Sequence, residues 1–129
     1  MDQTDKCLFH GHNKYPEKSW LKFLILRVIV ETPTCGYDII QRIEEMSYGR
    51  HKIKSGTMYT TLRRMEKENL VKSSWKKSTT GPDRRKYRAT KQGRTYLKYY
   101  LEMIIERKKI IDGMVRFYEK EFGGKKEGR

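Results

Sequence analysis

The chain has 129 residues and carries 30 Lys and Arg against 16 Asp and Glu, which gives a formal net charge of +14. This length suits one domain, and an aromatic content of 12% is too high for an intrinsically disordered chain. No apolar run reaches the roughly 18–20 residues that span a bilayer, the N-terminus lacks the pattern of a secretion signal, and two cysteines are too few for a disulfide scaffold. We therefore expect a small basic domain in the cytoplasm, with no membrane partner.

The positive charge is concentrated in one part of the chain. Between His51 and Tyr100 there are fifteen Lys and Arg and only three Asp and Glu, so this stretch holds +12 of the total of +14. Such a field attracts polyanions, with nucleic acid ahead of an acidic lipid surface. The alternative is a solvated basic surface with no specific partner.

The first half of the chain predicts an arm and two helices. Residues 1–17 lack periodicity and indicate a polar N-terminal arm. The segment Trp20–Val30 is apolar nearly all round, which favours a helix that is buried on more than one side. After the break T-P-T-C-G, apolar residues recur at a spacing of three from Tyr37 to Met46, which predicts an amphipathic second helix that ends at Ser47-Tyr48-Gly49.

A third helix is expected to begin at Ser55, a good N-cap residue, and to stop at Asn69, which tolerates a left-handed backbone. Its inner face would be formed by Met58, Leu62 and Met65. Its outer face begins with hydroxyl side chains and continues with cations. That order suits a groove between phosphates.

Two β-leaning segments and a long helix follow. Leu70–Lys77 and Arg84–Ala89 flank the turn-prone run S-T-T-G-P-D, which predicts a β-hairpin with a basic tip. Thr90 is expected to cap a final helix that reaches Phe122, with Gln92 completing a partial capping box. The expected fold is therefore mainly α with a small β-hairpin.

The final helix carries two parallel apolar stripes, which is more than one small domain can cover. The excess apolar face indicates a second copy of the chain. The alternative is a monomer whose helix folds back on itself at Gly113. The residues expected at the dimer contact are Trp20, Leu24, Leu101, Ile104, Ile111 and Val115.

Four motifs occur in a familiar order: GYDIIQRIEE (Gly36–Glu45), GTMYTTLRRMEKENLV (Gly56–Val71), GPDRRKYRAT (Gly81–Thr90) and KQGRxxL (Lys91–Leu97). Together they resemble the PadR-like family of transcriptional regulators. The resemblance implies a homodimeric repressor with a winged helix-turn-helix DNA-binding domain over residues 18–90 and a long dimerisation helix over residues 91–122. A flexible tail over residues 123–129 would follow.

The chain departs from the family pattern at three points. Thr60 stands where the family usually has Pro after G-T-x-Y, which adds a backbone N–H and a hydroxyl near the helix start. Lys86 stands where an aromatic residue is common, and the Trp that some ligand-responsive members carry on the C-terminal helix is absent. A small-molecule effector at the dimer interface is therefore left open, and the sequence does not reveal its identity.

The predicted DNA contacts lie on the third helix and the hairpin. Hydroxyls at a helix N-terminus can reach phosphates or base edges, and three adjacent cations suit contact with phosphate or the minor groove. The alternatives are that Thr57 merely caps the helix and that Tyr59 packs against the hairpin. Arg63 is expected to pair with a carboxylate such as Glu66 or Glu68. The predicted contacts are Lys54, Ser55, Thr57, Tyr59, Thr60, Arg64, Arg84, Arg85 and Lys86.

Neither enzymatic chemistry nor a cofactor is indicated. The sequence has no P-loop, no G-x-S-x-G and no paired-His motif. Cys7, His10 and His12 form C-x-x-H-x-H, a weak candidate for a metal site in the arm. Cys35 is expected to be a small packing residue in the turn between the first two helices.

We therefore expect a sequence-specific DNA-binding transcriptional regulator, a homodimeric repressor that reads a pseudo-palindromic site in double-stranded DNA and is released by an unknown effector. Three alternatives stay open: a sequence-nonspecific architectural nucleic-acid protein, a metal-responsive regulator, and a winged-helix module that binds a protein through its hairpin. A preference of about 10³ or more for the operator over random duplex distinguishes the regulator from the architectural protein.

Overall fold

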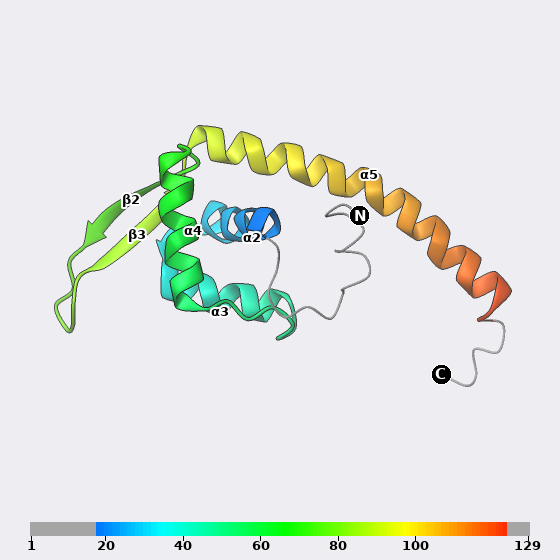
Figure 1. The fold of residues 1–129 in the computed structure, drawn as a ribbon, viewed down its shortest axis with the longest axis horizontal. Helices are drawn as coiled ribbons and strands as arrows, with labels where there is room; N and C mark the ends of the chain where they lie inside the picture. Colours follow the sequence, from blue (N-terminus) through cyan, green and yellow to red (C-terminus); the bar gives the residue numbers. More distant parts are fainter. Residues whose placement is uncertain (1–17, 124–129) are drawn as a thin grey trace. The chain divides into compact units, whose positions relative to one another are not determined.

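Four helices and a small antiparallel sheet make up the part of the chain that the computed structural model describes, residues 18–123 (Figure 1). The expected fold class, mainly α with a hairpin, is confirmed. None of the helices in this range is long and apolar enough to cross a membrane. The elements are α2 (Lys18–Glu31), β1 (Thr34–Cys35), α3 (Gly36–Met46), α4 (Ser55–Lys67), β2 (Val71–Lys76), β3 (Arg84–Ala89) and α5 (Lys91–Glu121).

The hydrophobic core is built around α2. Five of its side chains are buried, at spacings that cover most of the helix circumference, so the prediction of a helix buried on more than one side is confirmed. α3, α4 and β3 all contact it, and Lys22 adds an ion pair of 2.9 Å to Glu68 just after α4. The core residues are Leu21, Ile25, Leu26, Val28, Ile29, Ile39, Ile43, Ile53, Met58, Leu62, Met65, Leu70, Val71, Tyr87 and Leu97.

The sheet has three strands rather than the two that were expected. Its order is β1-β3-β2, with both neighbours antiparallel to β3, so β3 is the central strand. The segment T-P-T-C-G does not merely break the chain, because Thr34 pairs with Tyr87 and Cys35 with Lys86. Cys35 thus lies on an edge strand and not in a turn. A strand of two residues is too short to show a period of two in the sequence.

Two details of the helices differ from the predictions. The buried face of α3 is centred on Ile39 and Ile43, whereas Tyr37 is 59% exposed. A three-residue spacing drifts around the helix, since one turn takes 3.6 residues. Lys54 is the N-cap of α4 and makes no side-chain cap hydrogen bond, so Ser55 is the first helical residue and not the cap.

The stop signals after α3 and α4 are confirmed. Tyr48 and Gly49 adopt positive φ angles of 56° and 78° after α3, and Asn69 adopts 63° after α4. In this left-handed backbone the Leu70 N–H donates to the Met65 carbonyl at 2.9 Å, which satisfies one of the last carbonyls of α4. The turn directs the chain from α4 into β2.

Thr90 caps α5 as predicted and also ties it to the end of α4. Its Oγ1 accepts a hydrogen bond from the Gly93 N–H at 2.9 Å and donates to the Asn69 carbonyl at 2.7 Å. The predicted capping box is not formed, because Gln92 lies one position too early for it. The Gln92 side chain instead accepts from Asn69 Nδ2 at 3.2 Å and donates to the Glu68 carbonyl at 3.4 Å.

The described chain divides into two compact units. We call residues 18–97 the head and residues 98–123 the C-terminal unit. The first two turns of α5 belong to the head, where Gly93 and Leu97 are buried. α5 passes through Gly113 as one α-helix, so the alternative in which the helix folds back at this residue is wrong.

Gly93→Ala tests the contact between α5 and the start of β2. A Cβ at this position would lie 2.1 Å from the Leu70 carbonyl oxygen and 3.2 Å from Leu26 Cδ2. The carbonyl cannot move freely, because it also accepts the Thr90 N–H at 3.1 Å. We expect the variant to lose about 1–3 kcal/mol of unfolding free energy in urea titrations.

Gly113→Ala is the matched control for this substitution. It adds the same methyl group to the same helix, where the nearest atom outside the helix backbone is Arg116 Nη2 at 3.8 Å. Since Ala is a better helix former than Gly, this variant should gain up to about 1 kcal/mol. Equal stability of the two variants would contradict the close approach at Gly93.

Candidate nucleic-acid interface

α4 presents a polar face to solvent because its apolar face is held in the core. Met58, Leu62 and Met65 are fully buried and set the rotation of the helix. Thr57 and Thr60 are consequently exposed on its first two turns. Thr57 does not cap the helix, since no side chain caps its N-terminus. The first N–H groups and both hydroxyls therefore face the same solvent region, an arrangement that suits an anion or a base edge.

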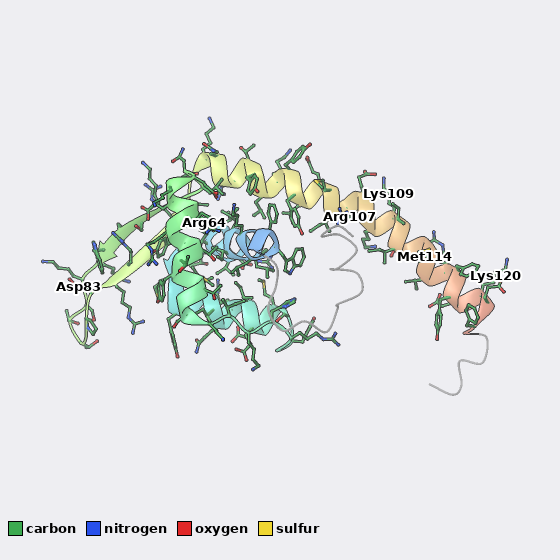
Figure 2. All side chains as sticks on the ribbon, viewed as in Figure 1. Arg64, Asp83, Arg107, Lys109, Met114 and Lys120 are labelled. Atoms are coloured by element: carbon green, nitrogen blue, oxygen red, sulfur yellow. The ribbon has the colours of Figure 1, made fainter. Side chains whose placement is uncertain are left out.

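Arg63 and Arg64 are both exposed cations of α4 (Figure 2 labels Arg64). The expected pairing of Arg63 with a neighbouring carboxylate is wrong. Glu66 accepts hydrogen bonds from Ser73, and Glu68 pairs with Lys22. Arg63 forms no ion pair within the described range 18–123, so it joins Arg64 as a candidate phosphate contact, a role that was not expected from the sequence.

Tyr59 packs against the start of α3 while keeping part of its ring in solvent. A Cβ at Gly36 would lie 2.6 Å from Tyr59 Cε1, so the ring lies directly on the glycine backbone. The side chain is 37% exposed. The packing partner is therefore α3, where the alternative had named the hairpin. The exposed remainder of the ring keeps a DNA contact by Tyr59 as a prediction.

The hairpin formed by β2 and β3 has two chemically different faces. On the inner face, toward the core, lie Val71, Ser73 and Trp75 of β2 opposite Ala89, Tyr87 and Arg85 of β3. On the outer face lie Lys72, Ser74 and Lys76 opposite Arg88, Lys86 and Arg84. The register thus separates the three adjacent cations that the sequence grouped: Arg85 is on the inner face, and Arg84 and Lys86 are on the outer face.

Arg85 is held in place by a tryptophan. Its guanidinium carbon lies 4.9 Å from the centroid of the Trp75 ring, directly across the strand pair, in a cation–π contact. Trp75 is itself 63% exposed. Arg84 instead reaches the edge strand, where its Nη1 lies 4.0 Å from Cys35 Sγ. Asp83, labelled in Figure 2, precedes these cations at the far end of the hairpin and accepts the Ser78 N–H at 3.1 Å.

Glu66 links the hairpin to α4 and was not identified as a site residue from the sequence. Its carboxylate accepts the Ser73 N–H at 3.2 Å and the Ser73 hydroxyl at 3.0 Å. Beside this link, burial raises the pKa of the Tyr87 hydroxyl above its ordinary value of 10.0, which keeps it neutral at physiological pH. The bidentate contact holds the hairpin in one position relative to the exposed face of α4.

The remaining predicted residues are placed as follows. Lys54, Ser55 and Lys86 are exposed. The weak metal candidates Cys7, His10 and His12 lie outside the described residues, and within the described range no three Cys, His, Asp or Glu gather around a common point. Of the predicted dimer residues, Leu101, Ile111 and Val115 are exposed on α5, and Trp20, Leu24 and Ile104 are partly buried.

Comparison with known proteins agrees with this arrangement of helices and hairpin. The chain is 34% identical over 92 residues to an uncharacterized protein of Lysinibacillus sphaericus, which covers 71% of this chain and 84% of that protein. Its fold is similar to that of a PadR-like transcription factor from Bacteroides fragilis, with 25% identity, a TM-score of 0.66 and coverage of 88% of this chain and 99% of the other. A transcriptional regulator from Clostridium thermocellum is 30% identical over 76% of this chain and 92% of its own, with a TM-score of 0.65.

Residues 25–99 match the family described as the transcriptional regulator PadR-like family. This range includes all of α3, α4 and the hairpin, together with most of α2 and the part of α5 that packs on the head. The members of this family are transcriptional regulators and not enzymes. The chain therefore belongs to the PadR-like family, and it is a DNA-binding transcriptional regulator.

Proposed function

We propose that the protein is a homodimeric repressor that binds a pseudo-palindromic operator with two copies of α4. The observation that carries this proposal is the exposed face of α4, where Thr57, Thr60, Arg63 and Arg64 are all open to solvent beside a cationic hairpin. Hydroxyls can discriminate base edges, and cations neutralise phosphates. In this proposal α4 reads the major groove and the hairpin holds the backbone.

The proposed dimer rests on the apolar surface of the C-terminal unit. Ile110, Met114 and Phe122 are 66–72% exposed, although side chains of this size are normally buried. A second α5 would cover them and would place two heads on one duplex, as a two-fold symmetric site requires. Such a dimer works in the cytoplasm, and an effector that binds between the subunits would act by changing the spacing of the heads.

Replacing Arg84 and Arg85 by Ala tests the role of the hairpin. Phosphate contacts provide affinity without sequence preference, so the double variant should bind operator and random duplex more weakly by the same factor. The slope of log Kd against log salt should fall by roughly 0.9 for each phosphate that the variant no longer neutralises. Titrations of both duplexes at several salt concentrations measure this change. An unchanged slope would remove the hairpin from the interface.

Replacing Thr57 and Thr60 by Ala tests the reading of bases by α4. Operator affinity should fall by about 1–3 kcal/mol for each base that the helix no longer reads, while binding to random duplex stays nearly the same. The operator is obtained first, by selecting bound fragments from genomic DNA at physiological salt. Equal losses on both duplexes would mean that α4 only positions the protein, which is the behaviour of an architectural DNA-binding protein.

Changing Ile104 and Ile111 to Asp tests the dimer. Two carboxylates per helix would be buried without partners in the helix–helix contact, which is strongly destabilising. Sedimentation of the variant should show monomers, and the head should keep its secondary structure because neither residue belongs to it. Lys108→Ala, an exposed change on the same helix, should leave the dimer intact. A wild-type protein that is already monomeric at tens of micromolar would refute the proposed assembly.

A further inference from the structure

We propose that the outer face of the hairpin is a second DNA-binding surface, which takes up the phosphates of duplex flanking the operator. This inference rests on the proposed function, because it assumes that α4 holds the operator itself. The surface consists of five cations on the face of the sheet opposite the core: Lys72, Lys76, Arg84, Lys86 and Arg88.

All five side chains are exposed, and none forms an ion pair with any residue in the range 18–123. The register even places like charges directly opposite each other, Lys72 across from Arg88 and Lys76 across from Arg84. Directly opposed like charges destabilise a strand pair. The fold therefore carries an unfavourable charge arrangement that a polyanion would relieve.

Protection of a sheet edge does not account for this surface. Lysines on an edge strand prevent further strand pairing, and β2 is an edge strand, so Lys72 and Lys76 could serve that purpose. Arg84, Lys86 and Arg88 lie on β3, which is paired on both sides. Three cations on the central strand have no edge to protect.

The spacing of these cations matches a phosphate backbone. Residues two apart on one face of a strand are separated by about 6.6 Å, so the row Arg84, Lys86 and Arg88 spans about 13 Å. One strand of duplex DNA carries about four phosphates over that length of helix axis. The row can therefore follow a backbone over several consecutive phosphates.

The face points to flanking duplex as its occupant and not to the segment held by α4. Glu66 fixes the inner face of the hairpin toward α4 through Ser73, and the outer cations lie on the other side of the sheet. Flanking phosphates of a bound operator are present at high effective concentration, so they reach the surface before a second DNA molecule does. Curvature of the flanks toward the hairpin would bring them into contact.

The test uses Lys72→Gln/Arg88→Gln and two duplexes with the same central operator, one of minimal length and one with about 20 extra base pairs on each side. The wild-type protein should bind the long duplex more tightly and with a steeper salt dependence. The variant should lose that gain, with a slope on the long duplex reduced by roughly 0.9 for each phosphate that it no longer neutralises. Its binding to the short duplex should be unchanged. Its melting temperature should be equal or higher, since an opposed pair of like charges is gone.

Arg107→Gln/Arg116→Gln removes the same charge from the C-terminal unit and should bind both duplexes as the wild type does. Several outcomes would overturn the inference. These are a wild-type protein that gains nothing from the flanks, a Lys72/Arg88 variant that keeps the full gain, and a variant that loses equally on both duplexes. Sedimentation that finds two duplexes on each dimer would assign the surface to a second DNA molecule. Absence of any operator preference would instead refute the proposed function.

Discussion

The carbonyl of Leu70 is the point at which the described elements of the head are joined. It accepts the Thr90 N–H and lies so close to α5 that a Cβ at Gly93 would come within 2.1 Å of it. Leu70 itself is placed by the left-handed turn at Asn69, which ends α4. One short stretch thus ends the recognition helix, begins the hairpin and receives the start of α5. Any shift of this carbonyl would move all three together.

The rotation of α4 follows from the same core that closes this junction. Three apolar side chains, Met58, Leu62 and Met65, are buried at helical spacing, and they turn the hydroxyls and arginines outward. No binding energy is needed to orient these groups, since the hydrophobic core already orients them. The Glu66 contact to Ser73 then fixes the hairpin beside this face. Base reading and phosphate binding are in this way held at one separation, which is a requirement for recognition of a defined site.

Charge on the hairpin is arranged against stability and in favour of binding. A strand pair with Lys72 across from Arg88 and Lys76 across from Arg84 would be more stable with one acidic partner in each pair. The cation–π contact of Arg85 with Trp75 offsets part of this cost on the inner face. Residues that break a local rule without a gain in stability are expected at functional surfaces. The unneutralised charge of the hairpin is therefore the strongest physical sign that its partner is DNA.

The sequence by itself determined the features that depend on neighbouring residues. The apolar content of α2, the buried stripe of α4, the stop at Asn69 and the cap at Thr90 are all visible within a few positions, because helix periodicity and capping are local. The four family motifs were equally legible. These signals were sufficient for the fold class and for the candidate DNA-binding elements.

Only the tertiary structure decided the features that join distant segments. The strand at Cys35 exists because Lys86 lies across from it, and Glu66 serves Ser73 and not Arg63 because the hairpin packs beside α4. Likewise, strand register and the position of the core decided that Arg85 faces inward while its neighbours face outward. Such contacts depend on how the chain closes on itself, and a window of a few residues contains no record of that closure.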